Sequence, residues 1–172
     1  MNIIRYPEKA NWNELLARPV LNTETLNDTV CEILSHIRKE GDKAVLEYEE
    51  KFDKVRLSSL CVTEEEFAKA EKKVSIELKA AIMLAWNNIR TFHESQRFIG
   101  KKVETLPGVT CWQKAVAIEK VGLYIPGGTA PLFSTVLMLA TPAQIAGCKE
   151  IILCKKKKKN GNVPAAILYA AR

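Results

Sequence analysis

The chain has 172 residues, of which 47% are hydrophobic and 27% are charged, and its 26 basic and 20 acidic side chains give a formal net charge of +6. This composition is typical of a globular protein of one domain, or of one domain with a helical arm. No apolar run is long enough to span a bilayer, and the N-terminus lacks the apolar core of a secretory signal, so we expect a cytoplasmic protein without a membrane role.

The first hundred residues predict helices whose ends carry recognisable signals. Gly41 is positioned to end a helix, and the apolar residues before it recur at helical spacing and predict one packing face: Leu26, Val30, Ile33, Leu34 and Ile37. Thr63 with Glu66 three residues later predicts a capping box. Ser75 is suited to cap a longer helix whose apolar stripe comprises Leu78, Ile82, Ala85, Ile89 and Phe92. Together these signals predict a helical N-terminal layer.

From residue 101 the pattern changes to alternation and short apolar runs. Val103–Leu106 predicts a strand, Pro107-Gly108 is a turn signal, and a second apolar run covers Val116–Leu123. We therefore divide the chain into a helical region over residues 1–100 and the start of an α/β region over residues 101–172.

A strand and a glycine turn form the most informative part of the chain. Val121–Ile125 is a short apolar run, and Pro126 ends it by removing a backbone donor. Gly127 and Gly128 allow the dihedral angles of a tight turn, which brings bare backbone to the surface. Ligands of open α/β sheets bind beside such turns. By spacing alone a plain turn is favoured, because two glycines after a strand lack the GxGxxG pattern of dinucleotide sites.

An apolar helix and a second strand follow this turn. Ser134–Ala146 predicts a helix buried on most sides, Gly147 stands at its C-cap, and Glu150–Cys154 predicts a strand parallel to the first. The predicted fold class is therefore α/β, a helical N-terminal layer leading into an incomplete Rossmann-like parallel sheet. The run Val163–Ala171 predicts a helix that ends at Arg172 without a cap, so we expect the α/β region to be truncated at its C-terminal end.

Metal and catalytic chemistry have little support in these residues. The cysteines are scattered without a CxxC pair, which predicts reduced thiols: Cys31, Cys61, Cys111, Cys148 and Cys154. Cys148 and Cys154 lack the nearby histidines of a zinc site. His36 and His93 lie in predicted helices beside charged residues, and we interpret them as structural positions rather than catalytic bases. We expect neither a metal site nor a catalytic residue within this stretch.

Several of these segments resemble the histidinol dehydrogenase family. Three segments resemble sequence motifs of this family and occur in the same order: Arg38–Val45, Glu50–Asp53 and Gly122–Gly128. The resemblance covers nearly the whole chain. It implies the N-terminal portion of a homodimeric, zinc- and NAD-dependent enzyme of histidine biosynthesis, which oxidises L-histidinol to L-histidine with two NAD molecules through the aldehyde. The family's zinc ligands and acid/base pair are expected beyond residue 172, so this stretch alone is expected to be inactive.

The resemblance also implies a cofactor site at the glycine turn, at the start of a nucleotide-binding region. Tyr124 matches the family tyrosine that contacts NAD, and its ring is suited to pack against a planar group while its hydroxyl hydrogen-bonds. Pro126, Gly127 and Gly128 are expected to shape the turn around the cofactor. Weaker candidates nearby are Thr129 and Ser134, and Ser134 is also suited to cap the helix that follows.

The five consecutive lysines at Lys155–Lys159 depart from the family, which has a short proline-containing turn there. Such a run can attract nucleic acid through counterion release, but no arginine or aromatic residue is interleaved with it, so a solvated loop is favoured. Three alternatives stay open: a dehydrogenase of the same fold acting on another small polar alcohol such as a sulfonated diol, a non-catalytic basic binding module, and a purely structural role.

Overall fold

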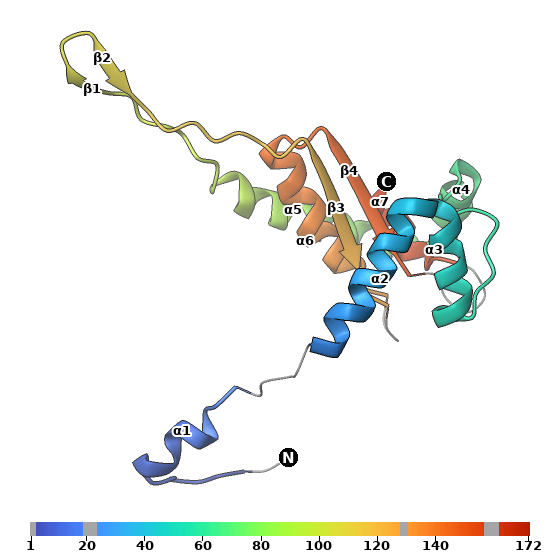
Figure 1. Ribbon diagram of the computed structural model, residues 1–172. Coiled ribbons are helices and arrows are strands. Elements are labelled where there is room, and N and C mark those ends of the chain that lie inside the picture. Colours follow the sequence, from blue (N-terminus) through green and yellow to red (C-terminus); the bar gives the residue numbers. More distant parts are fainter. Residues whose placement is uncertain (1–2, 19–23, 128–130, 157–161) are drawn as a thin grey trace. The chain divides into compact units, whose positions relative to one another are not determined.

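Figure 1 shows the computed structural model of the chain, which describes residues 3–18, 24–127, 131–156 and 162–172. The chain divides into two compact units, Met1–Val45 and Leu46–Arg172. None of the described helices is long and apolar enough to cross a bilayer. The second unit carries both strand pairs and the helices that pack on them.

The first unit consists of short helices and one long amphipathic helix. Its elements are the 3₁₀ helix η1 (Lys9–Asn11), α1 (Trp12–Leu15), α2 (Glu24–Glu40) and the start of α3 (Asp42–Tyr48). α2 ends where predicted, because Gly41 has a left-handed φ of +59° and its N–H donates to the Ile37 carbonyl oxygen (2.8 Å). The predicted packing face remains largely open, since Leu26, Val30 and Leu34 are 42 to 58% exposed. Apolar spacing specifies which side chains share a face, not what covers it.

The second unit begins with helices whose caps match the sequence signals. It contains the rest of α3, the π-helix η2 (Glu49–Asp53), α4 (Glu64–Lys73) and α5 (Ile76–Glu94). The Glu66 N–H donates to Thr63 Oγ1 (3.3 Å) while the Thr63 N–H donates to Glu66 Oε2 (2.8 Å), which completes the capping box of α4. At α5, Ser75 Oγ accepts a hydrogen bond from the Leu78 N–H (3.2 Å). Both predicted caps are confirmed.

The apolar stripe of α5 is covered along most of its length. Ile82 is buried, and Leu78 and Ile89 are partly buried, consistent with the packing of α5 on α6 (Phe133–Ala146). Phe92 departs from the prediction, because its side chain is exposed near the end of the helix. The stripe therefore packs through its centre rather than over its whole length.

The first strand pair is a hairpin. β1 (Val103–Leu106) and β2 (Val109–Cys111) pair antiparallel across the predicted Pro107-Gly108 turn. Gly108 has a φ of +82°, and its N–H donates to Glu104 Oε1 (2.8 Å), so a side chain closes the turn from the preceding strand. This confirms the turn signal, which requires glycine because of the positive φ.

The second strand pair is parallel, as predicted. β3 (Lys120–Ile125) and β4 (Glu150–Lys155) lie side by side, with α6 packed along β3 (Figure 1). Their register places Tyr124 opposite Cys154 and Ile125 opposite Lys155. The predicted apolar run starting at Val116 is only partly a strand, because β3 begins at Lys120 and leaves Val116 exposed.

The core lies on one face of the parallel pair. Ile125 of β3, Val136 of α6 and Ile167 of α7 (Ala165–Ala171) are fully buried. Partly buried apolar side chains surround them: Leu132, Phe133, Leu153, Val163 and Ala170. α6 is covered less than its composition predicted, because Met138 and Leu139 remain exposed. The packing of helices on a parallel pair confirms the predicted α/β fold class, while the division at residue 100 stays a prediction.

We predict that Ile125→Ala destabilises the chain by about 2–5 kcal/mol, because it removes methyl and methylene groups from a fully packed position and leaves a cavity. Urea unfolding of the 172-residue chain measures the loss. Ile76→Ala is the matched control, since Ile76 is 81% exposed, and we expect it to stay within about 0.5 kcal/mol of the parent. Equal losses for the two variants contradict this assignment of the core.

We also predict that Thr63→Ala lowers the free energy of unfolding by about 1 kcal/mol, because the Glu66 N–H loses its side-chain acceptor at the start of α4. Thr63→Ser retains the hydroxyl and should cost only a few tenths of that. Urea titration followed by far-ultraviolet circular dichroism compares the two. A serine variant as unstable as the alanine variant shows that the lost methyl group, not the cap, is responsible.

Candidate functional site

Tyr124 lies at the carboxyl end of β3, on the face opposite the core. Side chains alternate along a strand, so the burial of Ile125 turns its neighbour Tyr124 outward, where it is 62% exposed. Cys154, its register partner on β4, is exposed as well. An aromatic ring with a hydroxyl group is thus accessible at the strand end where ligands of parallel sheets bind.

The turn after β3 is tied to β4 by a lysine. Lys155 Nζ donates a hydrogen bond of 2.6 Å to the carbonyl oxygen of Pro126. Pro126 and Gly127 are both exposed. Gly128, the last of the predicted turn residues, and Thr129 lie outside the described residues, and their predicted roles stay predictions. The described half of the turn is therefore held at the edge where both strands end.

The next lysine reaches a different element. Lys156 forms a hydrogen-bonded ion pair with Asp53, the last residue of η2, and the Asp53 side chain is only 15% exposed. The hydrogen bond that Lys156 donates to Asp53 raises the pKa of Lys156, loss of water lowers it, and the negative charges of Asp53 and Glu49 raise it further. Lys156 therefore remains a cation and brings positive charge to the rim of the turn.

Gly127 accommodates this lysine. A β-carbon built on Gly127 would lie 3.0 Å from Lys156 Cδ, closer than packed carbon atoms approach one another. The missing side chain thus makes room for the Lys156 stem. The expectation that this glycine admits a cofactor is untested, and the structure adds a second reason for a glycine there.

The prediction of a loop is wrong for Lys155, because β4 extends to this residue, one past the predicted end. Lys156 follows the strand and is exposed, as a solvated loop predicts. Both lysines nevertheless have partners beside the end of β3. Lys157–Lys159 lie outside the described residues. Sequence reasoning missed these contacts because Asp53, within a family-like string, gave no sign of its distant partner.

The start of α6 also differs from expectation. The helix begins at Phe133, and its N-cap position is Leu132, which makes no side-chain cap hydrogen bond. Ser134 therefore lies inside the first turn rather than at the cap, because the helix starts one residue earlier than its apolar pattern predicted. The backbone N–H groups of the first turn of α6 face the carboxyl edge of the strands, where Tyr124 also lies.

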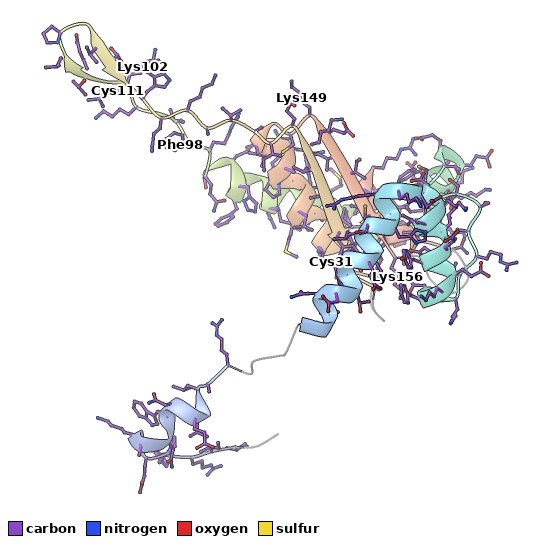
Figure 2. The ribbon with its side chains drawn as sticks, in the orientation of Figure 1. Cys31, Phe98, Lys102, Cys111, Lys149 and Lys156 are labelled. Atoms are coloured by element: carbon purple, nitrogen blue, oxygen red, sulfur yellow. The ribbon has the colours of Figure 1, made fainter. Side chains whose placement is uncertain are left out.

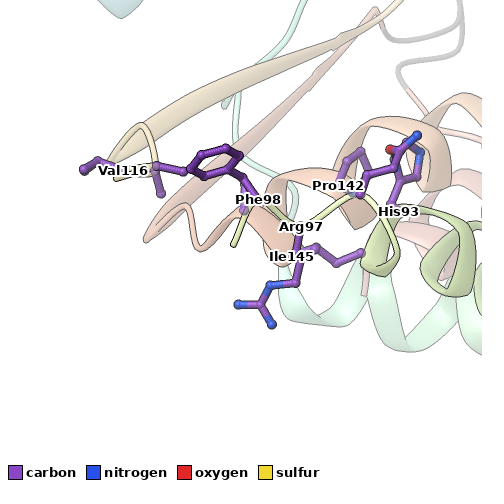
Figure 3. Close-up of a pocket in the computed structure, with 10 residues that line it drawn as sticks. His93, Arg97, Phe98, Val116, Pro142 and Ile145 are labelled. Carbon is purple, nitrogen blue, oxygen red and sulfur yellow. The ribbon is translucent and has the colours of Figure 1, made fainter. Parts of the chain in front are cut away.

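A surface hollow of about 350 Å³ lies at the other end of the strand pair. Its ten lining residues come from the end of α5 and the residues just after it, the segment before β3 and the last turns of α6. Figure 3 shows Phe98 and Val116 at one end and His93 and Pro142 at the other, with the Arg97 guanidinium pointing away from them. This is the amino edge of the parallel pair, so the hollow is separate from the Tyr124 turn.

The remaining polar candidates are accounted for locally. His93 Nδ1 lies 2.8 Å from Gln96 Oε1, and Glu94 accepts a hydrogen bond from Arg90 Nε (2.8 Å). All five cysteines are free thiols. Within residues 3–18, 24–127, 131–156 and 162–172, no three His, Cys, Asp or Glu side chains gather closely enough to hold a metal ion.

Comparison with known proteins places this chain in a family. The family model described as histidinol dehydrogenase matches residues 16–172. Histidinol dehydrogenase of Bacteroides thetaiotaomicron is 69% identical over 172 residues, which is all of this chain and 40% of the relative. That of Escherichia coli K12 is 49% identical over 160 residues, covering 92% of this chain and 36% of the relative. The chain thus spans about 40% of the length of its curated relatives.

A solved structure agrees in fold. The crystal structure of histidinol dehydrogenase from Elizabethkingia anophelis superposes with a TM-score of 0.89 at 47% identity and covers 96% of this chain and 38% of that one. The similarity in three dimensions therefore extends over almost every element described above.

We predict that Gly127→Ala costs about 1 kcal/mol of unfolding free energy, because the new methyl group displaces the Lys156 stem and disturbs its ion pair with Asp53. Gly122→Ala on β3 is the matched control. A β-carbon there meets nothing within 4 Å, so the substitution should be neutral or slightly stabilising. Urea unfolding of the 172-residue chain gives both values, and a Gly127→Ala variant as stable as Gly122→Ala contradicts the packing of Lys156 on the turn.

Proposed function

This chain belongs to the histidinol dehydrogenase family, and we propose that it supplies the N-terminal portion of an enzyme that oxidises L-histidinol to L-histidine with two NAD molecules through the aldehyde. The observation that carries the proposal is the 69% identity to a histidinol dehydrogenase over all 172 residues of the chain. The cytoplasmic location, the homodimer and the dependence on zinc and NAD are parts of the same proposal.

The geometry of the turn supports a role in binding NAD. Tyr124 presents an exposed ring and hydroxyl group at the carboxyl edge of a parallel pair, where a nicotinamide or adenine ring can pack and a ribose can accept or donate a hydrogen bond. Pro126 and Gly127 carry no bulky side chains of their own next to this ring, and Gly128 follows them in the sequence. Bound NAD would supply the hydride acceptor, while these residues would bind and orient it.

The part of the chain that the structure describes offers no site that fits zinc. The zinc ligands and the residues that move protons stay a prediction for sequence beyond residue 172. In this proposal the present residues therefore bind and position the cofactor, and catalysis is completed elsewhere in the full-length protein.

One alternative keeps the same fold. A dehydrogenase of another small polar alcohol, such as a sulfonated diol, would use the same nucleotide turn, because the turn recognises the cofactor rather than the alcohol. The basic binding module gains no support from the described lysines, since Lys155 and Lys156 donate their amine hydrogens to Pro126 and Asp53.

We expect the full-length protein that carries this chain to form NADH from L-histidinol in the presence of zinc, and Tyr124→Ala to raise its KM for NAD about 3- to 10-fold. The reason is the loss of an aromatic contact worth about 0.5–1.5 kcal/mol. Absorbance of NADH in steady-state assays measures both. Tyr6→Ala is the matched control, because Tyr6 is 99% exposed and lies outside the second unit.

Two results contradict parts of this proposal. If the protein forms NADH from a sulfonated diol but not from L-histidinol, its substrate belongs to the alternative class. If the protein forms NADH from L-histidinol and the Tyr124→Ala enzyme has the same KM for NAD as the parent and the Tyr6→Ala control, Tyr124 is not part of the cofactor site. The proposed reaction then still stands.

A further inference from the structure

We propose that Lys156 is a positioning residue of the cofactor site: paired with Asp53, it clamps the Gly127 turn between β4 and η2 and so holds Tyr124 in place for NAD. This inference rests on the proposed function and deepens it. It concerns a lysine outside the glycine turn, to which the proposed function gives no role.

The first support is the arrangement of two successive lysines at one strand end. Lys155 donates to the carbonyl oxygen of Pro126, which ties the turn to β4. Lys156 covers Gly127 with its stem and bonds Asp53 with its amine, which ties the same turn to η2. Two adjacent residues of the turn, Pro126 and Gly127, are thus held by two adjacent lysines, and Tyr124 lies two residues before Pro126.

The second support is the burial of the acidic partner. Asp53 is only 15% exposed and Lys156 is 46% exposed, whereas the pair that Lys149 makes with Glu119 just before β4 leaves its side chains 80% and 75% exposed. Ion pairs at the surface contribute little, because water and salt screen them, and covered pairs contribute more. Figure 2 shows Lys149 and Lys156 at opposite ends of the strand pair, so Lys149 is a natural control.

The third support concerns what the positive charge does. Lys156 faces the carboxylates of Asp53 and Glu49, whose charges raise its pKa, and its charge is therefore compensated within the chain. A cation that binds the phosphates of NAD directly would be weakened by those carboxylates. A compensated cation is better suited to fix backbone and side-chain geometry, and misplaced orienting groups can weaken an active site by up to about 10²-fold.

The test uses the full-length protein with Lys156→Met, Asp53→Asn, the double variant and the control Lys149→Met. Calorimetric titration gives the Kd for NAD, steady-state assays give kcat, and thermal unfolding gives Tm. We expect each single variant at the clamp to raise the Kd about tenfold with kcat near the parent value. The double variant should bind NAD no more weakly than either single variant, because each single substitution already removes the same ion pair. Lys149→Met should leave the Kd unchanged.

The sign of the Asp53→Asn effect separates positioning from direct contact. If Lys156 bound a cofactor phosphate, removal of its competing carboxylate would tighten NAD binding while Lys156→Met weakened it, and that pattern overturns the proposal. The proposal is also overturned if Lys156→Met and Asp53→Asn both bind NAD with the same Kd as the control Lys149→Met. Should Lys156→Met fail to fold, Asp53→Asn decides alone, because it removes the charge at constant side-chain size.

Failure of the proposed function gives a different result. A parent protein that binds no NAD removes the cofactor site, and the clamp with it. If the parent protein and the clamp variants all bind NAD with the same Kd and oxidise L-histidinol, the proposed function stands. Only the role of Lys156 is then rejected.

Discussion

The parallel pairing of β3 with β4 is the constraint on which the rest of the second unit depends. A parallel pair needs a crossover, which α6 supplies, and the crossover helix covers one face of the strands. Ile125, Val136 and Ile167 fill that face and exclude water from it. Because side chains alternate along a strand, the same pairing turns Tyr124 to the opposite face. The core therefore lies against one face of β3, and the candidate site lies on the other.

Parallel pairing also places both carboxyl ends at one edge, and this determines what surrounds the turn. The end of β4 lies beside the end of β3, so Lys155 meets Pro126 and Lys156 meets Gly127. Asp53 adds an anchor from a helix that precedes both strands. Pro126 and Gly127 are thus supported by the strand pairing that precedes them and by the two lysines beside them.

The relation to the family extends over nearly the whole chain. High identity over the whole chain and close superposition on a solved relative account for the helices, the strands and the glycine turn. The first two members of the lysine run make specific contacts, because Lys155 donates a hydrogen bond to the Pro126 carbonyl oxygen and Lys156 pairs with Asp53.

The sequence by itself determined the features that depend on near neighbours: the Thr63 capping box, the helix end at Gly41 and the parallel strand pair joined by an apolar helix. These need only backbone groups and side chains a few residues apart, or one crossover. Only the tertiary structure decided the partners of Lys156, because Asp53 lies 103 residues away and charge alone does not indicate which carboxylate a lysine meets. It likewise decided which apolar faces are covered, since periodicity aligns side chains on a face and packing alone buries them.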